Sequence, residues 1–260
     1  MQYEWWEYLL LAGGGFLAGV INTLAGNGSA ITLPLLISMG LPANEANATN
    51  RVGVLLQTLT AIISLKRSKR TLVLMRQSFW YFIPTILGSI GGALLAVDIN
   101  PQHLKLIIGV LMVFILITLL LQPKKWLINT DPGKNKKTTL QWVIFFAIGF
   151  YGGFIQMGIG IMILSSLVLL VHYSLKDANI IKLMVAFVMI VPAFAIYFLS
   201  GHIQWIPGIV LALGAGAGAW FGARYVLYHP KARDYIRYLL IVIVVFAIGK
   251  ILWPYIENAL

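Results

Sequence analysis

The sequence predicts an all-α integral membrane protein, built as an inverted repeat of two five-helix units with short broken or re-entrant helices. Hydrophobic residues make up 60% of the 260 residues and charged residues 10%, far below the roughly 25% charged residues of soluble domains. Apolar runs such as 104–121 are long and unalternated, which indicates helices of about 20 residues and not barrel strands. The third observation is that one pattern occurs in both halves of the chain.

Ten helical segments follow one another along the chain. The first five are expected at about 6–25, 29–40, 44–65, 74–97 and 101–121. The last five are expected at about 139–157, 160–173, 176–200, 204–226 and 231–256. Between the two sets lies the lysine-rich stretch "QPKKWLINTDPGKNKKT", which contains an Asp-Pro-Gly turn. We therefore predict a first repeat at 1–121, a basic cytoplasmic linker at 122–138 and a second repeat at 139–260.

Three stretches of the first half have counterparts in the second. The matched pairs are "GFLAGVINTLAGNG" (15–28) with "GFYGGFIQMGIGIM" (149–162), "EANATN" (45–50) with "DANIIK" (177–182), and "GSIGGA" (88–93) with "GAWFGA" (218–223). In this register Gly15 stands opposite Gly149, and Gly26 stands opposite Gly160. One unit of five segments thus occurs twice.

Basic residues gather in alternate connections, which sets the expected topology. They follow the third, fifth and ninth segments, at Lys66, Arg67, Lys69, Arg70 and Arg76, at Lys124, Lys125, Lys134, Lys136 and Lys137, and at Arg224, Lys231, Arg233 and Arg237. Such loops are cytoplasmic by the positive-inside rule, so both termini should lie outside the cytoplasm. Because each unit has an odd number of segments, the second copy enters the membrane from the opposite face. Inverted repeats of this kind are used by many secondary transporters.

Two segments are too short to cross the membrane. The segments at 29–40 and 160–173 reach only about 18 to 21 Å at 1.5 Å per residue, whereas the hydrocarbon core is about 30 Å thick. Either they are re-entrant helices, or they pair with broken first and sixth segments as hairpins that turn inside the membrane. Irregular backbone at that depth is tolerated only where protein or a watery cavity covers it.

The turns before these short segments have the composition of an anion site. A helix that begins inside the membrane directs free N–H groups and the positive end of its dipole at a ligand. Glycine allows close approach, and amides and hydroxyls add hydrogen bonds without buried charge. The candidate residues in the two turns are Asn22, Gly26, Asn27, Gly28, Ser29, Gln156 and Gly160.

The long segments that follow the turns each carry a polar stripe. Spacings of three and four residues place side chains on one helical face. The stripe residues are Asn47, Asn50, Arg51 and Gln57 in the first copy, and Asn179 and Lys182 in the second. A polar stripe with one cation per half suits a small oxyanion.

Each candidate also has a structural alternative. Glycines in membrane helices often serve close packing, which is our interpretation of "GSIGGALLA" and "LGAGAGAWFGA". For the polar residues the alternatives are hydrogen bonds between helices at Asn22 and Gln156, reach to the membrane interface at Arg51 and Lys182, and capping of a helix break at Asn47 and Asn50.

The chain resembles a known family. The Gly-rich turn followed by Pro34, the stretch "GLPANEANATN" and its counterpart "SLKDANIIK" are similar to the sulfite exporter TauE/SafE family, also called the four-toluene-sulfonate uptake permease family, over about 10–250. The resemblance implies a bacterial inner-membrane permease whose interrupted helices meet tip to tip near the midplane. It implies small sulfur-containing anions as substrates: sulfite, thiosulfate, sulfoacetate and other organosulfonates. Relatives that handle thiosulfate use cysteines, and this chain has none, which places sulfite or an organosulfonate ahead.

The leading hypothesis is therefore a secondary transporter, an exporter of sulfite or a sulfoacetate-like organosulfonate, that works by alternating access. The alternatives are an anion channel, or a permease for thiosulfate or a carboxylate. The sequence shows no Ser/His or Asp/Asp pairing at helical spacing and no metal-ligand cluster, so we expect no enzyme, catalytic residue, metal or cofactor. Besides the anion, the expected partners are membrane lipid and a second copy in a homodimer, with no nucleic acid.

Overall fold

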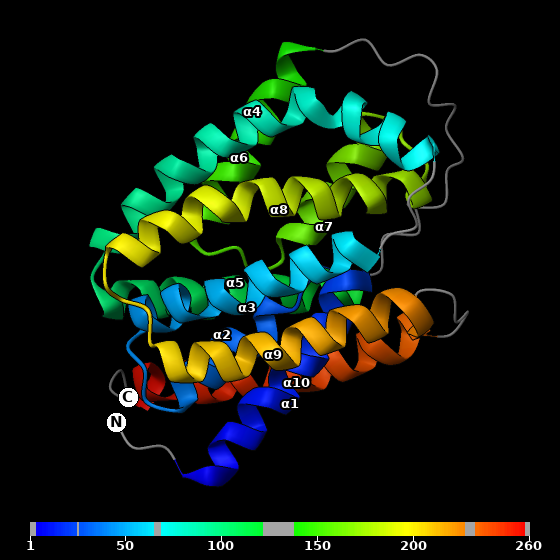
Figure 1. The fold of residues 1–260 in the computed structure, drawn as a ribbon. Coiled ribbons are helices and arrows are strands. Elements are labelled where there is room, and N and C mark those ends of the chain that lie inside the picture. The colour runs from blue at the N-terminus through cyan, green and yellow to red at the C-terminus, as the bar shows by residue number, and fades with distance from the viewer. Residues whose placement is uncertain (1–3, 25, 65–68, 122–137, 227–231, 258–260) are drawn as a thin grey trace.

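The computed structural model describes residues 4–24, 26–64, 69–121, 138–226 and 232–257, and in this part of the chain all regular secondary structure is helical (Figure 1). This confirms the all-α prediction. The helices are α1 (Trp5–Leu24), α2 (Ser29–Ser38), α3 (Ala43–Ser64), α4 (Lys69–Asp98), α5 (Pro101–Leu121), α6 (Thr139–Phe154), α7 (Ile159–Ser165), the π-helix η3 (Ser166–Leu170), α8 (Leu175–Leu199), α9 (Trp205–Phe221), the π-helix η4 (Gly222–Val226) and α10 (Ala232–Glu257).

Among the described residues, five helices are long and apolar enough to cross a membrane: α1, α4, α5, α8 and α9. Large apolar side chains such as Phe114 and Phe198 are exposed on their outer faces. An outer surface of this kind is stable in lipid, where the backbone hydrogen bonds are satisfied inside each helix. The molecule is a multi-pass membrane protein.

The broken segments are as short as predicted, and one of them ends early. The helix α2 has 10 residues and α7 has 7. The sixth segment was expected to run to 157, but α6 ends at Phe154. Gln156 and Gly158, with φ of 67° and 72°, both adopt the left-handed conformation that an α-helix cannot contain. Thr138 caps the start of α6, and the rest of the predicted linker lies outside the described residues.

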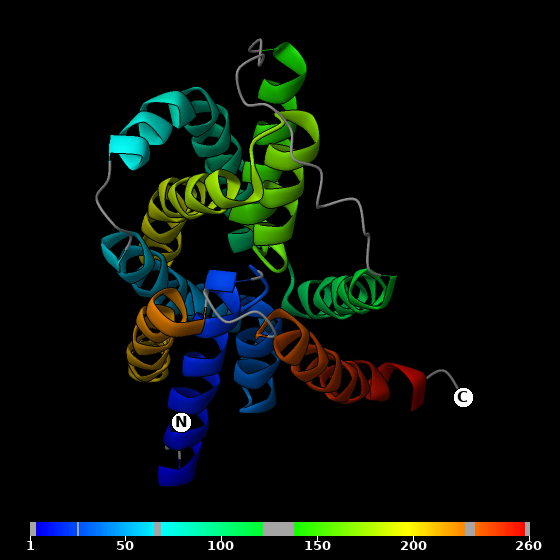
Figure 2. The same ribbon diagram turned by 90° about the vertical axis from the view of Figure 1, so that its right-hand side faces the viewer.

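The helices pack in two groups that mix the halves of the chain. Figures 1 and 2 show α4, α6 and α8 on one side of the molecule, and α1, α3 and α9 on the other. The largest apolar cluster, which includes Phe145, Ile163 and Met189, joins α4 and α6 to α7 and α8. A second cluster packs α5 and α10 against α2. The first helix of each half thus lies against the fourth helix of the other half.

Glycines allow this close packing. Eight glycines of α1, α4, α6 and α9 lie directly against a neighbouring helix. A Cβ added at any of the eight would overlap a backbone carbonyl oxygen of that helix. The contacts are Gly15 and Gly19 on Leu211 and Ala215, Gly149 and Gly153 on Thr85 and Ser89, Gly88 and Gly92 on Phe146 and Phe150, and Gly214 and Gly218 on Ala12 and Phe16. The packing interpretation of both glycine stretches is confirmed.

These contacts also test the register of the repeat. Gly15 and Gly149 occupy equivalent places, as the sequence match predicts. Gly88, however, corresponds in its packing to Gly214 and not to Gly218. The matched letters "GSIGGA" and "GAWFGA" are therefore displaced by one helical turn, because small residues recur at a spacing of four along α9. The contact of α1 with α9 is equivalent to the contact of α6 with α4, and this equivalence supports the duplication. The inverted orientation of the second copy stays a prediction.

Candidate functional site

The two glycine turns are in direct contact. The N–H of Gly160 donates to the carbonyl oxygen of Gly26, at 3.2 Å. A Cβ added to either glycine would overlap the Cα of the other, and Gly26 has a positive φ of 76°. Only glycine fits at both positions. The turn after α1 and the turn after α6, far apart in the sequence, therefore form one structural unit.

Arg51 of α3 holds the end of α6. Its Nη1 donates to the carbonyl oxygen of Gly152 at 2.6 Å, and its Nη2 donates to that of Gly153 at 2.9 Å. Nη1 also donates to Oε1 of Gln156 at 2.7 Å. The guanidinium lies 4.9 Å from the centre of the Tyr197 ring, within range of a cation–π contact. The last carbonyls of a helix need such donors when they are buried.

Two further side chains complete this cap. Nδ2 of Asn47 donates to the carbonyl oxygen of Phe154 at 2.8 Å and also to the hydroxyl of Tyr197. The Tyr197 hydroxyl lies 3.0 Å from the Phe154 carbonyl oxygen. Asn47 therefore caps the end of a helix, which is the structural role given above as the alternative to anion binding. The helix that it caps, α6, belongs to the other half of the chain.

Lys182 of α8 makes the reciprocal contact with the end of α1. Its Nζ donates to the carbonyl oxygen of Thr23 at 3.2 Å and to that of Asn22 at 3.4 Å. A cation at a helix C-terminus also opposes the negative end of the dipole. Arg51 and Lys182 are 0% and 2% exposed, so neither side chain reaches the membrane interface.

A small cavity lies where the two turns meet. Its apolar lining comes from Val54, Ile159, Leu183 and Ala186, and Thr58 adds a hydroxyl. Of the predicted site residues, six line it: Asn22, Gly26, Ser29, Gln156, Gly160 and Lys182. The structure thus brings polar and apolar residues of both halves to one cavity.

The remaining predicted residues lie around this cavity. Asn50 accepts from the hydroxyl of Thr32 at 2.6 Å and donates to that of Ser29 at 3.2 Å, which ties α2 to α3. The others are Asn47 and Arg51 in the cap of α6, Gly28 packed on Ala18, Gln57 buried on α3, Asn179 half-buried on α8, and Asn27. None of these lines the cavity.

Asn27 is the least expected of these. It is 0% exposed, and neither its Oδ1 nor its Nδ2 has a hydrogen-bond partner within the described residues. Oδ1 faces Gly158 of the opposite turn, and Ile115 of α5 lies beside the same glycine. The buried amide thus lies close to Ile115, which belongs to the apolar cluster of α2, α5 and α10.

The free N–H groups predicted at Gly160 are fewer than expected. No side chain caps α2 or α7, as the prediction requires. However, the Gly160 N–H is already bonded to Gly26, and α7 gives way to a π-helix after seven residues. Because the two turns are in contact, the Gly160 N–H is no longer free to bind a ligand.

The sequence prediction does not include the apolar residues of the lining, nor two polar residues of the site, Thr58 and Tyr197. Thr58 lies seven residues after Arg51, on the same face of α3, so the stripe spacing was a usable signal. Tyr197 lies more than three turns along α8 from Lys182 and reaches α6 only through the tertiary packing. The sequence gives no signal for Tyr197.

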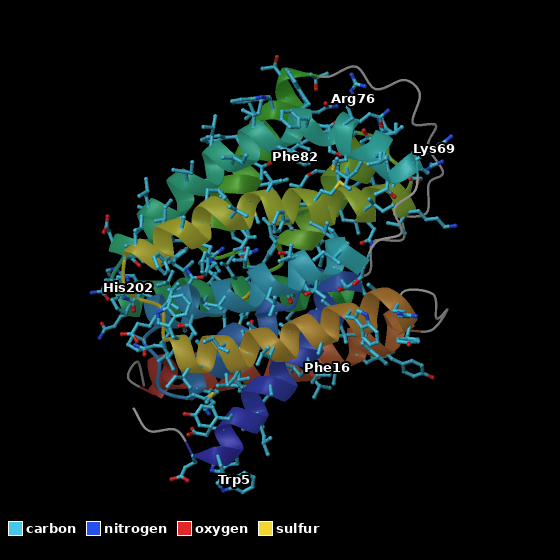
Figure 3. All side chains as sticks on the ribbon, in the orientation of Figure 1. Trp5, Phe16, Lys69, Arg76, Phe82 and His202 are labelled. Atoms are coloured by element: carbon cyan, nitrogen blue, oxygen red, sulfur yellow. The ribbon has the colours of Figure 1, made fainter. Side chains whose placement is uncertain are left out.

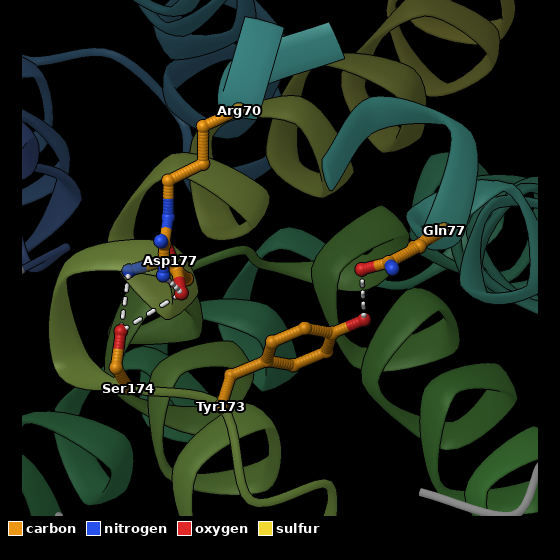
Figure 4. A network of polar contacts seen from close by, with 5 residues as sticks. All are labelled: Arg70, Gln77, Tyr173, Ser174 and Asp177. Atoms are coloured by element: carbon orange, nitrogen blue, oxygen red, sulfur yellow. Dashed lines mark hydrogen bonds and ion pairs between the residues drawn. The ribbon is translucent and has the colours of Figure 1, made fainter. Parts of the chain in front are cut away.

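A polar network joins α4 to α8 at one end of the molecule (Figure 4). Nε and Nη2 of Arg70 donate to the two carboxylate oxygens of Asp177, at 2.8 and 2.6 Å. Ser174 accepts from the backbone N–H of Asp177 and caps α8. Tyr173 donates to Gln77 at 3.4 Å. Asp177 thus does more than complement the helix dipole.

Residues 11–251 match the family described as Sulfite exporter TauE/SafE. A probable membrane transporter protein of Haemophilus influenzae is 29% identical over 88% of both chains. The probable membrane transporter protein YfcA of Escherichia coli is 26% identical over 91% of this chain and 86% of its own. No solved structure gives a significant match. The chain belongs to the sulfite exporter TauE/SafE family of membrane transporters.

Proposed function

We propose that this transporter exports small sulfur-containing anions, such as sulfite or organosulfonates, by alternating access. The observation that carries the proposal is the buried cavity between the two glycine turns, with Lys182 and Gln156 in its wall. Sulfite and sulfonate groups offer several acceptor oxygens and negative charge, which match N–H donors backed by an ammonium group. The family description, which names sulfite export, supports this choice of anion.

The surroundings of the cavity strengthen each polar contact. Val54, Leu183 and Ala186 contribute apolar side chains to its lining. In such a region of low dielectric constant, hydrogen bonds to an anion are stronger than in water.

The arrangement of the backbone supports a carrier and not a channel. Because the Gly160 N–H is bonded to the Gly26 carbonyl, the two turns obstruct a continuous path between them. Passage then requires the helix group of α4, α6 and α8 to move relative to that of α1, α3 and α9. Movement of one group of helices against another around a central site is the usual form of alternating access.

The proposed location is the bacterial inner membrane, with both termini outside the cytoplasm. Lys69 lies at one end of the long helices and His202 at the other (Figure 3). The end with Lys69, where the basic residues of the first half gather, would face the cytoplasm. The glycine faces of α4 and α9 are occupied within one chain, so a homodimer would have to use other surfaces.

Counterflow in proteoliposomes tests the function. Purified protein is reconstituted with unlabelled sulfite inside, and the entry of ³⁵S-labelled sulfite, sulfoacetate or thiosulfate is followed. We expect saturable exchange with sulfite or sulfoacetate. Absence of exchange with every anion of this panel would contradict the proposal.

Two other outcomes would favour the alternative functions. Single-channel current in planar bilayers without saturable exchange would indicate an anion channel. Exchange of a small carboxylate without exchange of any sulfur anion would indicate a permease for that carboxylate. To distinguish import from export, a membrane potential is imposed on oriented vesicles, and the direction in which labelled sulfite moves is measured.

A further inference from the structure

Arg51 lies behind the cavity wall. It does not line the cavity, and its hydrogen bonds run to the carbonyl oxygens of Gly152 and Gly153, to Asn47 and to Gln156. Gln156, in contrast, does line the cavity. The two residues meet through one contact, from Nη1 of Arg51 to Oε1 of Gln156 at 2.7 Å.

We infer that Arg51 is a positioning residue, which fixes the carboxamide of Gln156 so that its NH₂ group faces the bound anion. This inference rests on the proposed function of the cavity as an anion site. It assigns Gln156 and Lys182 to contact with the anion, and it removes Arg51 from that contact.

The chemistry of the carboxamide carries the argument. A glutamine side chain has one acceptor end and one donor end, and an anion accepts hydrogen bonds only from the donor end. Arginine is a donor without acceptors, so Arg51 selects the orientation in which Oε1 is turned toward it. Nε2 then forms the end that is available to the cavity, because the contact with Arg51 uses Oε1.

The position of both partners is firmly set. Arg51 is fully buried and is held by two backbone carbonyls and by the ring of Tyr197. Gln156 is 3% exposed, and its backbone adopts a left-handed conformation with φ of 67°. A non-glycine residue in this conformation is held there by its surroundings. A donor fixed in advance binds an anion without further loss of side-chain freedom.

A double-mutant cycle tests the inference. The variants are Arg51→Lys, Gln156→Leu and the pair, and the measurement is equilibrium binding of ³⁵S-labelled sulfite and sulfoacetate to purified full-length protein. Lysine at 51 is expected to keep a positive charge near the α6 carbonyls but to lose the fork that reaches Gln156. Each single change should weaken binding about tenfold, the value of one charge-assisted hydrogen bond. The pair should bind as weakly as Gln156→Leu alone.

The outcomes separate the possible roles. Additive losses in the pair would show that Arg51 acts without Gln156 and would overturn the inference. Binding of neither anion by the wild-type protein would refute the proposed function itself. Arg76→Lys, the same substitution at an exposed guanidinium on α4, is the matched control and should bind like the wild type.

A second variant covers the case in which Arg51→Lys does not fold. Gln156→Glu leaves Arg51 in place and gives it a carboxylate acceptor of the same shape. The melting temperature should stay equal or rise, whereas anion binding should fall at least tenfold, because a negatively charged acceptor replaces the donor. Unchanged anion binding in this variant would overturn the inference.

Discussion

Replacement of Lys182 by methionine should separate anion binding from folding. Methionine has nearly the length of lysine and fills the same space without charge. Lys182 is, among the described residues that line the cavity, the one basic residue. Its Nζ is therefore the group that we expect to pair with the anion.

The size of the effect on binding follows from the charge. A hydrogen bond to a charged partner contributes about 1.5 to 3 kcal/mol. Loss of this contact corresponds to a roughly 10- to 150-fold rise in the dissociation constant, at about 1.4 kcal/mol for each factor of ten. The Coulomb attraction across a few ångströms of protein is of the same order, so the lower end of this range is a conservative expectation.

The effect on stability should be small. The substitution removes two hydrogen bonds, which at 3.2 and 3.4 Å are at the long end of the usual range. It also removes the cost of burying a charged group, and the two terms oppose each other. We expect a change in the free energy of unfolding of no more than about 1 kcal/mol.

The assay is equilibrium binding of labelled sulfite, with thermal unfolding measured on the same sample. Lys176→Met is the control, because Lys176 lies on the same helix but is exposed; its binding should equal that of the wild type. An unchanged dissociation constant in Lys182→Met, with wild-type protein that does bind sulfite, would refute the assignment of Lys182.

Three further changes test the structure around the cavity. Gly160→Ala should lower the free energy of unfolding by about 1 to 3 kcal/mol, because its Cβ would overlap Gly26; Gly249→Ala, which meets no neighbour, should not, and equal melting temperatures would contradict the contact. Asn27→Ala should raise the free energy of unfolding by about 1 kcal/mol in thermal melts, since it removes a buried amide without partners; a clear loss of stability would show that this amide is satisfied. Asp177→Asn should lower the melting temperature while sulfite affinity stays unchanged, because Asp177 pairs with Arg70 outside the cavity; lost affinity would place this network in the binding site.

The fold followed from the sequence because its signals are local. Apolar runs and their lengths are set by the thickness of the membrane, so the helix boundaries agree within a few residues at most ends. The early end of α6 was missed because Gln156, a residue that usually favours helix, is held at positive φ. The Gln156 side chain bonds to Arg51, more than 100 residues away, and no local pattern reports such a contact.

The candidate site was predictable in its composition and not in its division of roles. The glycine turns and the two basic residues stand out as costly in a membrane. Arg51 and Lys182 occupy similar positions in the two halves, so the sequence gives both the same role. The structure distinguishes them, because Lys182 lines the cavity and Arg51 does not. The contacts of Arg51 with Tyr197 and Asn47 come from tertiary packing, which no local pattern reports.

The reciprocal caps also bear on how the chain is inserted during synthesis. The carbonyl oxygens of Asn22 and Thr23 accept hydrogen bonds from Lys182, which is synthesised about 160 residues later. Until then the end of α1 has no partner from the second half, and α9, its packing neighbour, is also absent. The first half is thus expected to remain open in the membrane and to require protection, since exposed polar backbone in lipid is costly. We therefore expect the two halves of the chain to fold together and not one after the other.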